Sequence, residues 1–441
     1  MMEVNVIGAG LAGSEASLVL SAAGIKVNLF EMRPAVTTPA HKSDHFAELV
    51  CSNSLGSMDL SDGKGLLKGE LEIFGSNLLK IAGRVRVRAG KALAVDRWAF
   101  QTAVTEFIYR RRNIEIVREE VSALDREGVT IVATGPLTSE KMCESIRTLL
   151  GEDNLYFYDA ISPIVSAESL DLEKGFFGTR YAEADDYLNF PLTEEQFDVF
   201  YRQLIEADEV AAHEFEDKAH FESCMPIEVI ARRGKQTLSF GPMRPVGLID
   251  PKTGKRPFCV VQLRRENEQG TMYNLVGFQT RLKIYDQKRV FSLIPGFERC
   301  EWLRFGSVHR NTYINSPAFL LPTLELESER RLMFAGQICG VEGYVESIAA
   351  GFVAGLNAAM KLTGKEVLPF PQGTMIGGLL QYISDRGKGE FQPINANFGL
   401  LPLPDVSHRK RDRRAIQVKR ALEKAREFKD LHFKFQPLCV I

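Results

Sequence analysis

The spacing of hydrophobic residues at the start of the chain changes from one period to another. Residues 4–7 form a short apolar run typical of a buried strand. Between residues 11 and 23, apolar residues recur every three or four positions, which predicts a helix ending at Gly24. A second apolar run covers residues 27–30. The order strand, helix, strand indicates an α/β domain with a parallel sheet.

The turn between the first strand and the helix has the spacing Gly-x-Gly-x-x-Gly, and Glu31 follows the second strand. In dinucleotide-binding folds these glycines permit a tight turn, close approach of a pyrophosphate and packing of helix on strand, while the acid binds a ribose hydroxyl. A chance glycine turn is the alternative. The candidate cofactor-binding residues of this part are Gly8, Ala9, Gly10, Leu11, Ala12, Gly13 and Glu31.

Two later segments favour FAD over a free nicotinamide nucleotide. Residues 129–136 read as a strand that runs into a glycine turn, and residues 332–355 as a strand, a glycine turn and a helix of small residues. We therefore expect a Rossmann-type, glutathione-reductase-like FAD-binding domain that is discontinuous, with residues 1–174 and 301–441. The cofactor-binding candidates here are Gly135, Gly336, Glu342, Gly343 and Tyr344.

Residues 175–300 are expected to form a smaller inserted α+β domain. Thr193 and Gln196 suit a capping box before a helix with one apolar face. Residues 258–263 and 272–278 read as strands. Domain boundaries derived from sequence are accurate to only a few residues.

Composition is that of a globular protein, with 45% hydrophobic and 25% charged residues and a net charge of −2. A nucleic-acid partner would therefore have to be bound by local basic patches. No apolar run long enough to cross a bilayer stands out, and the N-terminus lacks the features of a signal peptide. The seven cysteines show no close pairing, so we expect reduced thiols, a cytoplasmic location and no metal site.

Two cysteines lie in unusual surroundings. Cys51 sits in the polar turn CSNSLGS, and Cys224 precedes a Met-Pro pair with several cations just downstream. Nearby positive charge lowers the pKa of a thiol and raises the thiolate fraction, although a structural cysteine remains the alternative for both. His309 lies in a polar segment, where an ordinary structural histidine is equally compatible with the residues.

Basic residues cluster in two places. Arg84, Arg86 and Arg88 alternate, so they are expected to share one face of a strand. Near the C-terminus, Ala415, Val418, Leu422 and Ala425 predict a helix with one apolar stripe, whose other faces carry cations that include Arg413 and Arg420. These five arginines are candidates for contacts with nucleic-acid phosphates, and a solvated charged face is the alternative.

Longer segments add to these motifs, among them GAGLAGSEAS, ELVCSNSL, CMPIEVIARRG, LSFGPMRPVGLIDPKTGK, HRNTYINSP and FAGQICGVEGYVESIAAG. Together they resemble the bacterial family of folate- and FAD-dependent tRNA (uracil-54-C5)-methyltransferases. The inserted domain would then contribute to the active site and to tRNA binding, and the five arginines would be candidates for tRNA contacts. The second glycine segment also resembles that of a related flavoenzyme that modifies the tRNA wobble uridine. That relative is longer and lacks the two cysteine blocks in this form.

The resemblance implies methylation of carbon 5 of uridine 54 in the tRNA T-loop. The carbon would come from 5,10-methylenetetrahydrofolate and the electrons from FAD reduced by NADPH or NADH. It also implies that Cys51 and Cys224 are the catalytic thiols, that His309 stacks on the folate pterin and that Tyr344 lies beside the flavin. We assign Cys224 as the nucleophile that attacks uracil and Cys51 as the general base, although either thiol could be the nucleophile.

Two other functions fit parts of the sequence. A flavin-dependent oxidoreductase of small molecules would explain the glycine motifs but would leave both cysteine blocks unused. A tRNA-binding factor without catalytic activity would explain the basic C-terminal helix. The extent of the matching motifs favours the methyltransferase.

Overall fold

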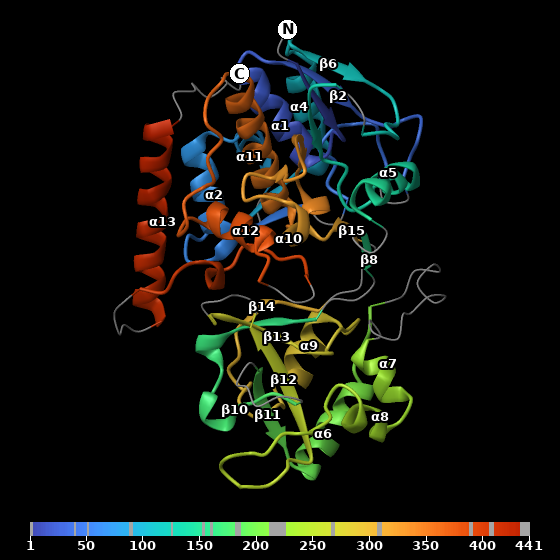
Figure 1. Cartoon of the computed structure of the whole chain (residues 1–441), viewed down its shortest axis with the longest axis vertical. Helices are drawn as coiled ribbons and strands as arrows, with labels where there is room; N and C mark the ends of the chain where they lie inside the picture. The colour runs from blue at the N-terminus through green and yellow to red at the C-terminus, as the bar shows by residue number, and fades with distance from the viewer. Residues whose placement is uncertain are drawn as a thin grey trace. The chain divides into compact units, whose positions relative to one another are not determined.

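The chain forms two compact units, one of which is interrupted by the other. The first contains residues 1–157 and 311–441, and the second contains residues 158–310 (Figure 1). The structure, a computed structural model, describes residues 3–38, 41–50, 53–87, 91–124, 127–151, 155–158, 162–180, 187–210, 226–265, 270–306, 311–387, 391–404 and 410–432.

The first unit is built on a six-stranded sheet. Neighbouring strands are parallel except β16 and β17, which are antiparallel. Every residue of β7 is buried, as expected for a parallel strand covered on both faces. In spatial order the strands are β16 (Glu325–Leu326), β17 (Glu329–Phe334), β7 (Val129–Val132), β1 (Glu3–Ile7), β2 (Lys26–Phe30) and β6 (Ile114–Val117).

Strand β1 lies in the interior of this sheet, with β2 on one side and β7 on the other. The chain moves outward from β1 to β2 and later returns to β7, so the strand order reverses between β1 and β7. In open α/β sheets, ligands bind at the carboxyl ends of the strands at such a reversal. The strands predicted from the hydrophobic pattern at residues 4–7, 27–30 and 129–132 are confirmed.

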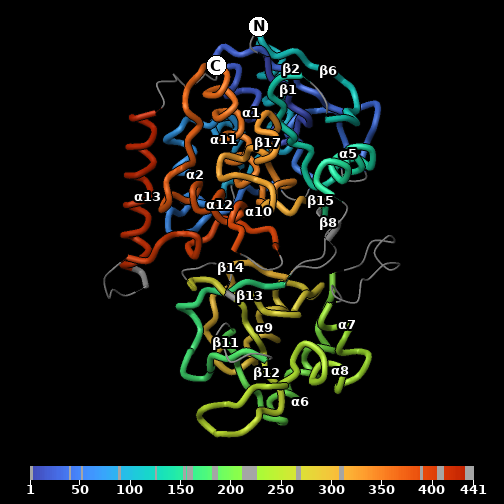
Figure 2. The backbone as a smooth tube through the Cα atoms, viewed as in Figure 1, coloured from blue at the N-terminus to red at the C-terminus, as the bar shows by residue number. Residues whose placement is uncertain are grey.

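Helices α1 (Leu11–Ala22) and α11 (Tyr344–Leu362) pack against each other with their backbones close together (Figure 2). A Cβ atom on Gly351 would lie 2.1 Å from the carbonyl oxygen of Ala12, so only glycine fits there. By length and composition α11 could cross a membrane, which corrects the expectation that no such run exists. Because 89% of its apolar window is buried, α11 is the core helix of this unit.

Around the central sheet lie further helices and two small sheets. Strands β3, β5 and β4 form one of these, and β8 and β15 pair where the chain leaves and re-enters the unit. The remaining elements are β3 (Ser54–Ser57), α2 (Gly63–Phe74), α3 (Asn77–Arg84), β4 (Arg86–Val87), β5 (Ala92–Val95), α4 (Arg97–Tyr109), α5 (Glu140–Leu150), β8 (Leu155–Tyr158), β15 (Asn311–Ile314), α10 (Ser316–Phe319), α12 (Met375–Ser384) and α13 (Lys410–His432).

The predicted C-terminal helix is present as α13, which packs against α2. Its predicted apolar stripe is correct in part, because Ala425 is buried and Val418 and Leu422 are half-buried. Ala415 is exposed, and the residues that face the protein interior are Gln417, Ala421, Ala425 and Phe428. Phe428 anchors this contact against Phe370, with ring centroids 4.9 Å apart. The buried face therefore combines small residues with one aromatic side chain and does not include Ala415.

The expected arrangement of the first basic cluster is wrong. Arg84 is the last residue of helix α3, whereas Arg86 begins strand β4, so the two do not share a strand face. The helix starts with Ser76, whose side chain accepts a hydrogen bond from the amide of Leu79, and its apolar face is buried. Burial of that face fixes the helix through Arg84. Arg88 lies outside the described residues.

The second unit contains a six-stranded antiparallel sheet. The capping box of Thr193 and Gln196 is confirmed, as are the two predicted strands. Leucines and phenylalanines make up much of the core, for example Phe190 and Phe297 in edge-to-face contact at 5.1 Å. The elements are β10 (Phe176–Phe177), β11 (Tyr187–Leu192), β12 (Cys259–Arg265), β13 (Met272–Leu275), β9 (Ile164–Ser166), β14 (Trp302–Arg304), α6 (Glu194–Ile205), α7 (Ile227–Arg232), α8 (Lys235–Phe240) and α9 (Ile284–Phe291).

This unit is wider than the inserted range 175–300 because β9 and β14 belong to the same sheet. Both strands lie outside that range, and β9 joins β13 to β14. The short apolar runs that form them resemble any buried strand in sequence, so only their pairing reveals which unit they belong to.

Candidate cofactor site

One pocket of the first unit lies at the carboxyl ends of β1, β2 and β7, where the strand order reverses. It encloses about 1030 Å³ including its open mouth, which is at the upper end of ligand pockets. Ala9, Gly13, Glu342 and Gly343 flank it without lining it. The predicted cofactor residues that line it are Gly8, Gly10, Leu11, Ala12, Glu31, Gly135, Gly336 and Tyr344.

Glycine occupies the three positions of the first turn for different structural reasons. Gly8 has φ +98°, and a Cβ atom there would lie 2.6 Å from the carbonyl oxygen of Ala133. A Cβ atom on Gly13 would lie 1.8 Å from the carbonyl oxygen of Gly8. Gly10 instead faces open space, with no atom within 4 Å of a Cβ position. The pocket therefore has room for a bulky group at Gly10.

Two helices begin at this pocket, each preceded by a glycine. Gly10 is the N-cap of α1 and Gly343 is the N-cap of α11, so neither helix receives a capping side chain from that position. The first amides of a helix are unpaired within the helix, and its N-terminus carries partial positive charge. Two such N-termini at one pocket suit an anion such as a pyrophosphate.

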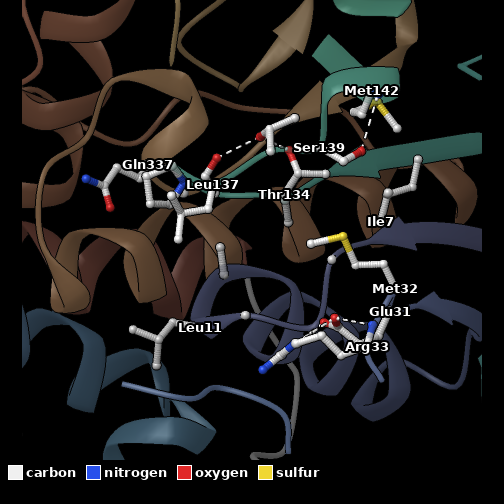
Figure 3. Close-up of a pocket in the computed structure, with 18 of the residues that line it drawn as sticks. Ile7, Leu11, Glu31, Met32, Arg33, Thr134, Leu137, Ser139, Met142 and Gln337 are labelled. Carbon is white, nitrogen blue, oxygen red and sulfur yellow. Dashed lines mark hydrogen bonds and ion pairs between the residues drawn. The ribbon is translucent and has the colours of Figure 1, made fainter. Parts of the chain in front are cut away.

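Glu31 lies at the end of β2 beside Arg33 (Figure 3). Its carboxylate accepts hydrogen bonds from the amide of Ala9 at 3.1 Å and from Nε of Arg33 at 2.9 Å. Burial disfavours the charged carboxylate, but the hydrogen bonds and positive charge of Arg33 outweigh burial and lower the pKa of Glu31. A charged acceptor at this position suits a ribose hydroxyl.

The segment 41–50 forms another part of the pocket, where His41, Glu48 and Val50 line it. Burial and the nearby charge of Arg33 lower the pKa of His41, which favours the neutral ring. Sequence reasoning did not single out Arg33 or Glu48. The available signal was the arginine two positions after the strand-end glutamate.

The opposite side of the pocket is formed by the turn after β7, including Thr134, Leu137 and Ser139, and by Gln337 (Figure 3). Hydroxyl groups of Thr134 and Thr138 are 2.7 Å apart and hold this turn together. The sequence did not predict the threonine and serine residues of this turn, because a single Thr or Ser after a strand is common in any protein.

Proteins with known names resemble this chain along most of its length. The model of the family described as glucose inhibited division protein A matches residues 3–366. A protein of Sulfurihydrogenibium sp. named methylenetetrahydrofolate–tRNA-(uracil-5-)-methyltransferase TrmFO is 50% identical over 429 residues, which cover 97% of this chain and 98% of that protein. The protein of the same name from Anoxybacillus flavithermus is 53% identical over 97% of this chain and 99% of its own.

The chain belongs to the TrmFO family.

The solved structure of Aquifex aeolicus GidA in its form I crystal is similar in fold, with a TM-score of 0.52 and 19% sequence identity. The match covers 98% of this chain and 77% of that chain. The fold is thus shared with a longer protein, whereas the TrmFO relatives match this chain along almost their whole length. The Rossmann-type, FAD-binding fold class predicted from the sequence is confirmed.

The residues that carry the TrmFO chemistry in our sequence prediction are not placed by the structure. Cys51, Cys224 and His309 lie outside the described residues. Cys51 follows Val50, which lines the pocket, and Cys224 precedes Pro226, the N-cap of α7. The assignment of both thiols therefore stays a prediction.

Other cysteines of this TrmFO family chain are poor candidates for a thiolate. Burial raises the pKa of Cys259 to about 12 and that of Cys339 to about 12, so both are thiols at neutral pH. Cys143 is also buried, and Cys300 packs at the edge of the core of the second unit. Within the described part of the chain, no group of three or more His, Cys, Asp or Glu could hold a metal ion.

Proposed function

We propose that this protein transfers a one-carbon unit from 5,10-methylenetetrahydrofolate to carbon 5 of uridine 54 in the tRNA T-loop. The observation that carries this proposal is about 50% identity, over nearly the full length of both chains, to proteins named as folate-dependent tRNA uracil-5-methyltransferases. Free tRNA as substrate implies a reaction in the cytoplasm.

The pocket of the first unit is suited to FAD. The N-termini of α1 and α11 would bind the pyrophosphate, with Gly10 leaving room for it, and Glu31 would bind a ribose hydroxyl. Tyr344, the first residue of α11, would lie beside the flavin ring. FAD reduced by NADPH or NADH would supply the hydride that completes the methyl group.

The two thiols would carry out the covalent steps on uracil. Carbon 5 of uracil is a weak nucleophile, and addition of the Cys224 thiolate to carbon 6 makes it reactive. Once the carbon–carbon bond to the methylene group has formed, Cys51 would remove the proton from carbon 5. The bond between the methylene carbon and its carrier nitrogen would then break, and hydride from reduced FAD would convert the methylene group into the methyl group. Departure of the Cys224 sulfur from carbon 6 would finally restore the double bond of the ring.

Binding of the substrates would involve further groups. His309 would stack on the folate pterin. The target uridine is held inside the folded T-loop, so it must be extruded to reach the thiols. Cationic side chains at Arg84, Arg86, Arg88, Arg413 and Arg420 would contact tRNA phosphates, and such contacts weaken as salt concentration rises.

A direct test uses folate labelled in the methylene carbon, NADPH and an unmodified tRNA transcript. We expect label in 5-methyluridine at position 54 and none in a matched transcript that carries cytidine there. Turnover of NADPH with a small acceptor, without label in tRNA, would instead support an oxidoreductase. Tight tRNA binding without transfer would support a non-catalytic binding factor.

A further inference from the structure

A buried arginine links two acidic residues of the cofactor pocket. Arg33 is 2% exposed. Its Nε donates to Oε1 of Glu31 at 2.9 Å, and its Nη1 donates to Oε2 of Glu48 at 3.0 Å. The side chains of Glu31 and Glu48 are less than a tenth exposed. Since removal of one partner from a buried pair leaves an uncompensated charge, the three groups depend on one another.

Glu48 in turn organises the segment that leads to Cys51. Its carboxylate accepts hydrogen bonds from the amide of Lys42 at 2.8 Å, the amide of Ser43 at 3.2 Å and the hydroxyl of Ser43 at 3.0 Å. Nη1 of Arg33 also donates to the carbonyl oxygen of Ser43 at 3.1 Å. The beginning and end of the segment 41–48 are therefore held together by one carboxylate and one guanidinium group.

The same segment is attached to the first glycine turn through Ala9. The amide of Ala9 donates to Glu31 at 3.1 Å, and its carbonyl oxygen accepts from the amide of Ala47 at 2.9 Å. Ala47 has φ +51°, a left-handed conformation that is unfavourable for a residue with a side chain. Such a conformation persists only where the surroundings enforce it. Segment 41–50 is thus fixed by the pocket rather than by its own preference.

We propose that Arg33 is a positioning residue. It couples binding of a ribose at Glu31 to the conformation of segment 41–50, which leads to Cys51. Glu31 already accepts from the amide of Ala9 and from three donors of Arg33, which uses the usual capacity of a carboxylate. A ribose hydroxyl that binds Glu31 competes with these donors. The shared guanidinium group then interacts more strongly with Glu48 and tightens segment 41–50.

This inference rests on the proposed function, because it assumes that the pocket binds a ribose-containing cofactor and that Cys51 acts in the transfer. The hydrogen bonds on which it depends all join described residues. A cofactor that binds at one end of the network changes the stability of hydrogen bonds at the other end, which is a coupling between two sites.

Amide hydrogen exchange of the peptide 41–50, with and without added FAD, tests the coupling. In the unaltered protein we expect FAD to slow exchange of this peptide. In Glu48→Gln we expect exchange to be roughly tenfold faster and nearly independent of FAD, while FAD still binds. Exchange of the peptide 344–362 from the core helix should be the same in Glu48→Gln as in the unaltered protein. Glu115→Gln, which alters the exposed pair of Glu115 with Lys26 at 3.3 Å, is the matched control.

A kinetic comparison separates positioning from general stabilisation. Glu48→Gln and Arg33→Lys should each lower kcat for methyl transfer about tenfold or more, with KM for tRNA unchanged within about twofold. Lysine retains the charge but cannot bridge both carboxylates, so Arg33→Lys should resemble Glu48→Gln. If Glu48→Gln does not fold, Ser43→Ala removes one hydrogen bond to Glu48 and should give a smaller increase in exchange.

Two results would overturn the inference: exchange of 41–50 that still responds to FAD in Glu48→Gln, or faster exchange that extends equally to 344–362. The exchange experiment needs neither tRNA nor folate. Absence of methyl transfer by the unaltered protein would therefore count against the proposed function while leaving the coupling measurable.

Discussion

The two units of the molecule use different kinds of sheet, and the difference suggests a division of tasks. In the first unit, parallel strands end together at one edge, so the turns after β1 and β7 and the start of α11 form a single pocket. In the second unit, an antiparallel sheet packs on helices through a core rich in leucine and phenylalanine. We expect flavin binding to depend on the first unit, whereas the second unit supplies Cys224.

The sharpest test of this division is Cys224→Ala. Because the cofactor pocket lies within the first unit, the variant should contain as much flavin as the unaltered protein. Loss of the nucleophile should lower methyl transfer at least about 1000-fold. Flavin content is measured by absorbance and transfer by labelled folate.

Cys300→Ala is the matched control, since Cys300 belongs to the same unit and packs at the edge of its core. It should retain transfer. A Cys224→Ala variant that methylates tRNA at the normal rate, or one that loses its flavin, would contradict the division.

Within the first unit, two glycines of one turn can be told apart. Gly10→Ala places a methyl group in open space, so the apoprotein should be as stable as before while FAD binds at least about tenfold more weakly. Gly13→Ala places a methyl group 1.8 Å from the carbonyl oxygen of Gly8, which should destabilise the fold by about 1–3 kcal/mol. FAD titration and urea unfolding measure the two effects. Equal effects of both variants on stability would contradict the assigned roles.

The basic helix α13 belongs to the first unit but should serve tRNA rather than FAD. Arg413→Ala with Arg420→Ala should weaken tRNA binding several-fold and reduce the slope of log affinity against log salt by roughly 1 for each lost phosphate contact. FAD affinity should not change. Lys26→Ala, at an exposed ion pair on the central sheet, is the control. An unchanged salt slope would show that α13 is only a solvated surface.

A pH-dependent effect comes from a buried carboxyl in the first unit. Glu70 accepts hydrogen bonds from the amides of Met375 and Ile376 at the start of α12. Burial outweighs these bonds and raises its pKa to about 8. The folded protein therefore holds a proton that the unfolded chain releases from about pH 4.5 upward, so this contribution to stability is lost as pH rises towards 8.

Glu70→Gln removes that titration. Between pH 5 and 8 the free energy of unfolding should decline less steeply in the variant, by up to about 1.4 kcal/mol per pH unit. Urea unfolding of both proteins at several pH values measures the slopes. Parallel slopes would mean that Glu70 is charged throughout this range.

The sequence predicted those features that depend on local patterns. Strand β1, the glycine turn and helix α1 follow from a run of apolar residues and three glycines within a short stretch, and the capping box at Thr193 is equally local. Errors arose where tertiary packing decides. Burial of the apolar face of α3 keeps Arg84 in that helix. In α13, the buried side chain is Phe428 rather than Ala415.

Contacts between distant parts of the chain were missed for a different reason. Arg33 and Glu48 meet only because segment 41–50 folds back onto the glycine turn, and no periodic pattern records such a contact. The thiols were assigned by family resemblance, since isolated cysteines carry little information about their reactivity. The resemblance to TrmFO is now supported along the whole chain, while the roles of Cys51 and Cys224 are still predictions.

The central claim is that methylenetetrahydrofolate donates the methylene group but no hydride, while a flavin in the first unit supplies the reducing hydride. A reaction with methylenetetrahydrofolate deuterated at carbon 6 of the pterin tests it directly, because tetrahydrofolate can itself donate a hydride from that carbon. Mass spectrometry of the T-loop fragment should show a methyl group without deuterium. Deuterium transferred from carbon 6 into the methyl group would contradict the account.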